Sequence, residues 1–164
     1  MSLPRIQPGP GRSMSRLAAV LCLAVVLGLA GGCGLFSKPY KPTLLKTRQL
    51  VFYLDRRFNQ GMTLPLDVCF VLVKGTPDSI LKISPEDWFA KDKRDKYAYK
   101  QALSFHPRQH SPVKVVLQVP PDTQDLVIVA DYINLTGAKG QQLVITAPGK
   151  PQEVIFVTDK GIYR

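Results

Sequence analysis

The hydrophobic residues of the chain gather in short runs from residue 48 onward, and in one of these runs they alternate with polar residues. Val113, Val115 and Leu117 alternate with Lys114 and Gln118, which is the pattern of a strand with one face in water. Similar runs of Val, Ile, Leu, Phe and Tyr recur at intervals of roughly 8 to 15 residues with turn residues between them, which is typical of an all-β sandwich. The predicted strands cover residues 48–55, 66–74, 99–106, 113–119, 126–133, 142–146 and 152–158.

The run at residues 126–133 (LVIVADYI) differs from the others, because it is hydrophobic on both faces apart from Asp131. A strand with one face in water would alternate. This run therefore predicts a central strand covered by the other sheet or by a helix.

One helix start interrupts the strand pattern at residues 84–89 (SPEDWF). Ser84 suits the N-cap, proline suits the first helical position, and the two acidic residues favour the positive end of a helix. We expect about two turns of helix, with Trp88 and Phe89 buried at one open end of the sandwich. The mixed charges of residues 91–96 predict a solvated segment. The predicted fold is an all-β, two-sheet β-sandwich with one short helical insertion.

The first 32 residues follow another pattern. Arg5, Arg12 and Arg16 precede an apolar run at residues 17–30 (LAAVLCLAVVLGLA). This run is shorter than the roughly 20 residues that a transmembrane helix needs, and its length is that of the hydrophobic part of a secretory signal peptide. Met14 is an alternative initiator, and the same interpretation follows from either start.

The residues after the apolar run, Ala-Gly-Gly-Cys at 30–33, resemble the lipobox of bacterial lipoproteins. That motif prefers leucine three residues before the cysteine, whereas here Ala30 holds this position and Leu29 precedes it. The resemblance implies acylation of Cys33, and several acyl chains give stable membrane anchoring. Gly34, by the sorting rule of Gram-negative lipoproteins, implies transfer to the outer membrane. The other interpretation is an ordinary thiol after a signal peptide or a short anchor.

These features divide the chain into three parts. Residues 1–32 are the predicted signal peptide, residues 33–46 the acylated cysteine with a proline-containing linker, and residues 47–164 the β-sandwich domain. With Cys33 acylated, Cys69 is the one remaining cysteine of the mature chain, so a monomer has no internal disulfide. We expect Cys69 to behave as a small buried hydrophobic residue.

The charge balance is basic. The whole chain has 22 Lys and Arg against 12 Asp and Glu, and loss of three arginines with the signal peptide leaves a net charge of +7. In an exported domain this favours attraction to anionic lipid headgroups or to an acidic protein partner. No nucleic-acid-binding motif accompanies the charge.

Metal binding is not predicted. His106 and His110 have a spacing of four, which can chelate a metal from one helical face, but Pro107 and Pro112 prevent a regular helix there. We expect both histidines in exposed turns and predict no cofactor.

Catalysis is not predicted either. The sequence contains no nucleophile elbow and no phosphate-binding glycine loop, and its serines have no arrangement that singles one out. Asp55, Asp67 and Asp131 receive no catalytic role, because aspartates at strand ends commonly accept backbone hydrogen bonds. The sequence therefore does not predict an envelope hydrolase.

The order of motifs resembles the TssJ/SciN-like family, the outer-membrane lipoproteins of the type VI secretion membrane complex. That order is a lipobox, an opening strand, a loop with Asn59, Gly61 and Pro65, a second strand, a Trp-Phe helical segment, and a proline turn leading into a buried strand. The corresponding segments are 30–33, 50–54, 59–65, 66–73, 84–89, 120–123 and 126–132. Residues 134–139 depart from the family, which usually has an aromatic-rich segment with arginine there.

The resemblance implies a transthyretin-like β-sandwich and a non-enzymatic role. In that role the protein is lipid-anchored in the outer membrane, faces the periplasm, and binds the periplasmic domain of a large inner-membrane secretion protein. The loop implied to make the contact comprises Arg56, Arg57, Phe58, Asn59, Gln60, Gly61 and Met62. Arginine and aromatic residues are common at interfaces. In the equally weighted alternative, the two arginines are solvated and Phe58 folds onto the core.

The sequence is also compatible with a second function. An envelope lipoprotein could instead hold a carbohydrate, a peptidoglycan fragment or a metal in a cleft, with Trp88 and Tyr97 or Tyr99 as stacking surfaces. Stabilisation against heat by such a ligand would distinguish this function from the first.

Overall fold

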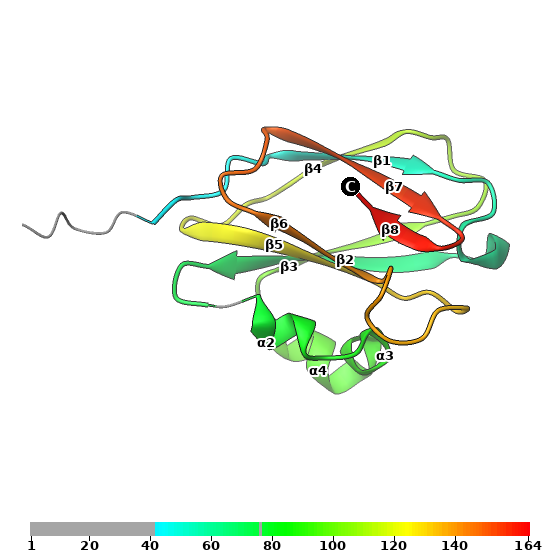
Figure 1. Ribbon diagram of the computed structural model, residues 1–164, viewed down its shortest axis with the longest axis horizontal. Helices are drawn as coiled ribbons and strands as arrows, with labels where there is room; N and C mark the ends of the chain where they lie inside the picture. The colour runs from blue at the N-terminus through cyan, green and yellow to red at the C-terminus, as the bar shows by residue number, and fades with distance from the viewer. Residues whose placement is uncertain (1–41, 76) are drawn as a thin grey trace, which may run out of the picture. The chain divides into compact units, whose positions relative to one another are not determined.

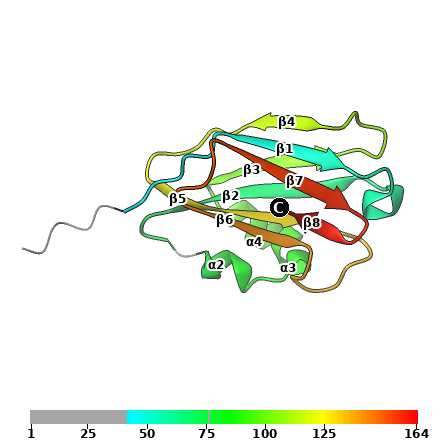
Figure 2. The same cartoon turned by 45° about the horizontal axis from the view of Figure 1, so that its top comes forward.

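Two four-stranded β-sheets face each other in the computed structural model, which describes residues 42–75 and 77–164 (Figure 1). The predicted signal peptide, Cys33 and the linker up to residue 41 lie outside the described residues. Figure 2 shows the two layers from a second direction. The predicted all-β, two-sheet sandwich is confirmed.

The first sheet has the strand order β4-β1-β7-β8. Strand β1 is central and runs parallel to β7 and antiparallel to β4, while β8 pairs antiparallel with the last residues of β7. The bounds are β1 Gln49–Leu54, β4 Val113–Val116, β7 Gln152–Thr158 and β8 Gly161–Tyr163.

The second sheet has the strand order β3-β2-β5-β6 and is antiparallel throughout. Leu66 of β2 lies opposite Leu103 of β3 on one side and Ala130 of β5 on the other. The bounds are β2 Leu64–Leu72, β3 Lys100–Phe105, β5 Thr123–Ala130 and β6 Gln142–Thr146.

The main core lies between the sheets, where alternate residues of every long strand point inward. Phe52 of the first sheet packs on Phe105 of the second, with ring centroids 4.8 Å apart. Leu45 also belongs to this core, and its N–H donates to the carbonyl oxygen of Thr123 at 2.9 Å. The packed domain therefore includes residues that precede the predicted boundary at residue 47.

Three short helices cover the outer face of the second sheet (Figures 1 and 2). They are α2 Asp78–Leu81, α3 Pro85–Phe89 and α4 Lys91–Lys96. The predicted cap of α3 is confirmed, because Ser84 Oγ accepts from the N–H of Asp87 at 3.1 Å. A second hydrophobic cluster fills the space between helices and sheet and consists of Cys69, Val71, Ile80, Trp88, Val127 and Val129. Strand β5 is thus covered on both faces, as its sequence predicts.

Trp88 is buried as expected, but its place differs from the prediction. It packs on the outer face of the second sheet instead of closing an open end of the sandwich. Its Nε1 donates to Oδ2 of Asp67 at 3.0 Å, and its ring meets Tyr97 edge-on at 5.6 Å. Trp88 lies there because the helical insertion that carries it packs against the outer face of the second sheet.

The prediction that residues 91–96 form a solvated segment is wrong for Arg94. Its guanidinium makes a bidentate pair with the fully buried Asp67, with Nε to Oδ2 at 2.7 Å and Nη2 to Oδ1 at 2.9 Å. Donating these hydrogen bonds to Asp67 raises the pKa of Arg94 further above its ordinary value. A buried carboxylate requires such a partner, because desolvation disfavours an isolated charge.

The predicted strands are all present, and residues 142–146 and 152–158 match β6 and β7 to the residue. The run 113–119 is shorter than predicted, since regular pairing ends at Val116. Strand β8, helices α2 and α4 and the 3-10 turn η1 Phe58–Gly61 were not predicted.

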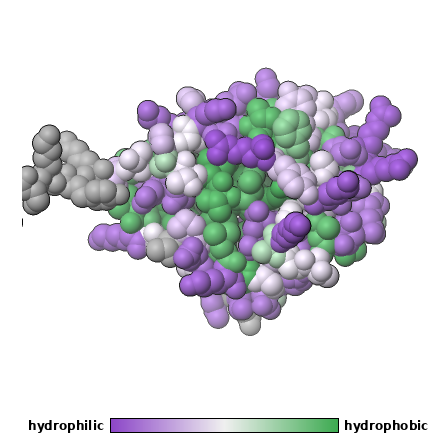
Figure 3. Space-filling view, viewed as in Figure 1, coloured by the Kyte–Doolittle hydropathy of each residue, from purple (hydrophilic) through white to green (hydrophobic). Residues whose placement is uncertain are grey.

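The edge formed by β6 and β7 is incompletely covered, because β8 pairs only with Phe156, Val157 and Thr158. Figure 3 shows hydrophobic residues gathered in a band across the middle of this side of the molecule, over β7 and β6. Glu153 lies buried at this edge and accepts two hydrogen bonds from Arg164, each at 2.9 Å. An inward-facing charge is one of the devices that protect sheet edges against unwanted pairing.

Candidate partner-binding surface

The loop between β1 and β2, residues 55–63, turns sharply at one end of the sandwich. Asn59, Gln60 and Gly61 all have left-handed backbone conformations, with φ angles of 47°, 54° and 75°. Glycine and asparagine tolerate this region, whereas Gln60 is strained there. We call residues 55–63 the tip loop.

Buried side chains hold the tip loop from within. Phe58 is 1% exposed and belongs to the main core. The fully buried Asn59 donates from Nδ2 to the carbonyl oxygen of Thr63 at 2.7 Å, and its Oδ1 accepts from the N–H of Ile133 at 2.8 Å. The second of these bonds joins the tip loop to the loop that follows β5.

The tip loop and the last residue of β1 are also bonded to the β3–β4 loop, residues 106–112. The N–H of Leu54 donates to Ser111 Oγ at 2.9 Å, and Thr63 Oγ1 lies 3.1 Å from His106 Nδ1. Within the tip loop, the N–H of Arg57 donates to Asp55 Oδ1 at 2.8 Å. The strained turn is thus fixed by hydrogen bonds to two neighbouring loops.

The structure separates the seven predicted contact residues into two groups. Phe58 and Asn59 are buried, so they hold the loop in shape and do not face outward. Phe58 folds onto the core, as one of the two sequence interpretations expected. The exposed group consists of Arg56, Arg57, Gln60, Gly61 and Met62, and Met62 is 56% exposed.

A polar cavity of about 270 Å³ opens between the tip loop and the β3–β4 loop. Asp55, Arg56 and Phe58 line it from the tip loop, and Gln109 and His110 from the other loop. Sequence reasoning missed this contribution of the β3–β4 loop, because only the fold brings the two segments together.

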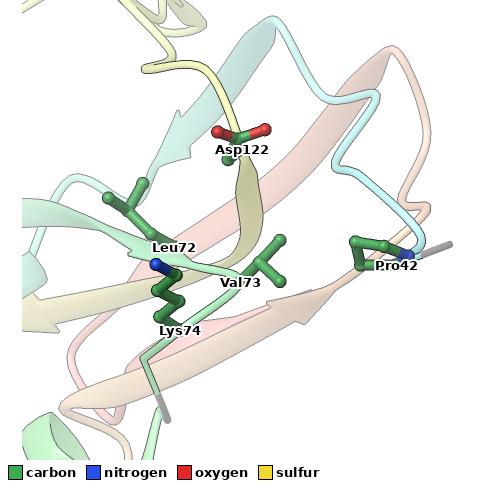
Figure 4. A pocket seen from close by; sticks show the side chains of 5 residues that line it. All are labelled: Pro42, Leu72, Val73, Lys74 and Asp122. Carbon is green, nitrogen blue, oxygen red and sulfur yellow. The ribbon is translucent and has the colours of Figure 1, made fainter. Parts of the chain in front are cut away.

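Another cavity, of about 360 Å³, lies at the opposite end of the sandwich (Figure 4). Pro42, Leu72 and Val73 make it largely hydrophobic, with Lys74 and Asp122 beside them. One cation and one carboxylate offer few of the convergent polar groups that fix a small ligand.

The residues predicted to stack on a ligand are only partly available. Trp88 is buried against Asp67 and Tyr97. Tyr97 donates its hydroxyl to the carbonyl oxygen of Phe70 at 2.9 Å, and burial raises the pKa of Tyr97 to about 12. Tyr99 is exposed and lines, with Tyr97, a hollow of about 240 Å³.

Cys69 and the two histidines, which could in principle bind a metal, lie in surroundings that do not favour this chemistry. Cys69 is buried, and burial, reinforced by the nearby Asp67, raises the pKa of its thiol far above the ordinary value, so the thiol stays protonated. His106 contacts Thr63 and His110 lines the polar cavity. In residues 42–75 and 77–164, no three His, Cys, Asp or Glu side chains gather as a metal site would require.

None of the helices in the described part of the chain combines the length and the hydrophobicity that crossing a membrane requires.

Comparison with known proteins finds chains with a similar fold but none with a similar sequence. No protein-family model matches the chain, and no curated protein matches its sequence. Among solved structures, Lip of Serratia marcescens, a membrane-bound component of the type VI secretion system, superposes with a TM-score of 0.57 at 18% identity. The match covers 72% of this chain and 96% of Lip.

Two other solved structures match over a similar length. A chain of a type VI membrane complex gives a TM-score of 0.59 at 12% identity, covering 75% of this chain and 98% of that one. A structure described as the C-terminal domain of the type VI secretion protein TssM, from EAEC, gives 0.54 at 14% identity, covering 71% and 98%. The fold resemblance to type VI secretion lipoproteins that the sequence predicts is confirmed.

Proposed function

We propose that this chain is the outer-membrane lipoprotein of a type VI secretion membrane complex, anchored through acylated Cys33. In this role its domain faces the periplasm, and the tip loop binds the periplasmic domain of a large inner-membrane partner. The role is structural and involves no catalysis. The observation that carries the proposal is the construction of the tip loop, which is held rigidly yet presents exposed arginine and methionine side chains.

Rigidity matters because a binding loop that is already ordered loses less conformational entropy on association. Asn59 and Phe58 supply that order from inside the loop. Arginine and methionine are both enriched at protein interfaces relative to the remaining surface. Arg56, Arg57 and Met62 therefore have the composition expected of a contact surface.

The fold likeness supports the same role. It extends over at least 96% of the three solved chains, so the whole of those domains is represented here. The lipobox supplies the anchor that such a role requires. The carboxylate of Asp67 and the thiol of Cys69 serve packing and pairing, which agrees with a structural protein.

Binding to the partner tests the proposal directly. The full chain in detergent is titrated calorimetrically with the periplasmic domain of the large inner-membrane secretion protein from the same organism. We expect saturable binding that weakens about tenfold or more in Arg57→Glu with Met62→Ser, because exposed interface anchors carry most of the binding energy. The matched control is Lys82→Glu with Tyr99→Ser, which alters an exposed cation and an exposed hydrophobic residue elsewhere and should retain wild-type affinity.

Either of two results would count against this function. An absence of saturable binding by the wild-type chain overturns the role in the complex. Equal binding by the loop variant and the control variant moves the contact away from the tip loop.

Anchoring is tested separately by growing cells with labelled palmitate. We expect the wild-type chain to carry the label and to fractionate with the outer membrane. Cys33→Ser should carry no label, because the acylated thiol is absent. A Cys33→Ser chain that still carries the label would exclude Cys33 as the attachment site.

A further inference from the structure

Exposed aromatic rings lie on the outer face of the first sheet, next to the tip loop. Tyr53 of β1 and Phe156 of β7 stack with ring centroids 5.7 Å apart and an interplanar angle of 26°. They are 44% and 48% exposed. Tyr163 of β8 lies opposite Phe156 in the sheet and is also exposed. We call these three residues the aromatic ledge.

The aromatic ledge is continuous with the polar cavity at the tip. A hollow of about 240 Å³ runs along the ledge and is lined by Tyr53, Phe156, Leu54, Asp55 and Ser111. The last three of these residues also line the polar cavity. The sheet face, the tip loop and the β3–β4 loop therefore form one surface with a hydrophobic part and a polar part.

The charge of the polar part is positive. Arg56 lines the cavity, and Arg57 and Arg108 are exposed on the same two loops. The acidic residue among the lining groups is Asp55, one oxygen of which already accepts the N–H of Arg57. His110 adds a ring nitrogen that can donate a hydrogen bond. Such a site attracts a carboxylate, and arginine is well suited to bind one.

We propose that the surface formed by the aromatic ledge and the polar cavity docks an acidic segment of the protein partner. A hydrophobic side chain of that segment lies on Tyr53 and Phe156, and a neighbouring Asp or Glu carboxylate enters the cavity beside Arg56 and His110. The inference rests on the proposed function and extends it, because it adds residues outside the tip loop to the contact and gives the partner a defined chemistry. Exposed aromatic residues beside arginines have the composition of binding hot spots.

The test repeats the titration of the full chain with the partner's periplasmic domain, using substitutions outside the tip loop. Phe156→Ser probes the ledge and Arg108→Glu probes the β3–β4 loop. Each should weaken binding about tenfold. Tyr99→Ser and Lys74→Glu are the matched controls: Tyr99 is also 48% exposed, and Lys74 is exposed at the opposite end of β2. Both controls should stay within about twofold of the wild type.

The possible outcomes separate the two proposals. If Arg57→Glu with Met62→Ser weakens binding but Phe156→Ser and Arg108→Glu do not, the contact is confined to the tip loop and this inference fails while the proposed function stands. If the wild-type chain does not bind at all, both fail. Affinity that is unchanged between low and high salt would exclude an acidic segment, because contacts between exposed charges weaken with salt.

Amide hydrogen exchange of the wild-type chain gives a measurement that does not depend on variant folding. Addition of the partner domain should slow exchange in residues 53–57, 107–111 and 155–158. Residues 72–75 and 97–99 should exchange as before. The reverse pattern would overturn the inference.

Discussion

The two sheets of this sandwich have outer faces of opposite character. On the second sheet, helices α2 to α4 bury Cys69, Val127 and Val129 and bring Arg94 onto Asp67. On the first sheet, Tyr53 and Phe156 remain nearly half exposed. The difference shows that one outer face of the same fold can be covered for stability while the other stays exposed to solvent. Four predictions test this contrast.

The largest loss in the free energy of unfolding is expected when the ion pair between Arg94 and Asp67 is broken. Arg94→Ala leaves the fully buried carboxylate of Asp67 without its counter-charge, and removal of one partner of a buried pair costs about 3–5 kcal/mol. Urea unfolding measures the loss. The control is Lys93→Ala, whose exposed contact with Asp87 is 3.8 Å long and should contribute at most about 1 kcal/mol. Equal effects of the two substitutions would show that the covered face is not held by this pair.

The next effect compares hydrophobic residues on the two faces. Ile80→Ala removes a buried side chain of α2 and should lower the free energy of unfolding by about 2–4 kcal/mol. Phe156→Ala removes a larger side chain from the open face and should cost about 1 kcal/mol or less, since nearly half of it is already in water. Urea unfolding of both variants makes the comparison. A Phe156→Ala cost as large as that of Ile80→Ala would remove the distinction between the faces.

A smaller effect concerns the start of α3. Ser84→Ala removes the oxygen that accepts from the N–H of Asp87, and loss of an N-cap typically costs about 1 kcal/mol. Thermal unfolding should show a lower midpoint for this variant, whereas Ser104→Ala, at an exposed position of β3, should not change the midpoint. An unchanged midpoint for Ser84→Ala would mean that packing of Trp88 alone holds the helix in place.

The smallest effect depends on pH. Burial, reinforced by Glu86, raises the pKa of Asp131 in the folded chain, so ionised Asp131 destabilises the fold at neutral pH. Asp131→Asn should therefore be more stable than wild type at pH 7, by less than the loss expected for Ser84→Ala. Because the folded chain holds this proton more strongly than the unfolded one, the advantage should vanish as the pH falls below about 3.9, the ordinary pKa of aspartate. Urea unfolding of both chains between pH 7 and about pH 3.9 measures this advantage. An advantage that grows on acidification would contradict the raised pKa of Asp131.

The sequence predicts the strands well, because alternation and turn residues are local signals. Residues 154–157 form a short hydrophobic run that indicates a strand, whereas β8 has three residues and is too short to show a period. Arg94 stands among charges of both signs, and the direction in which it points depends on the buried Asp67, which is distant in sequence. Such a pairing cannot be derived from residues 91–96 alone.

The candidate surface is predictable only in part, for similar reasons. Gly61 and Asn59 indicate a turn, and the exposed arginines follow from it. A single phenylalanine in a polar loop gives no indication of whether it is buried, and the structure alone places Phe58 in the core. That Tyr53 and Phe156 lie side by side follows from the parallel pairing of β1 with β7, which joins segments about a hundred residues apart.

Strand β1 also has a mechanical consequence. It is paired on both sides, over four residues with β4 and six with β7. Its beginning follows directly from the segment that connects it to the N-terminal part of the chain, and its end leads into the tip loop. If a lipid tether holds the first end and a partner pulls on the second, the load runs along the strand and across its hydrogen bonds. Bonds loaded in shear must break together and not one after another, so such a load would meet more resistance than a force that peels the strand away.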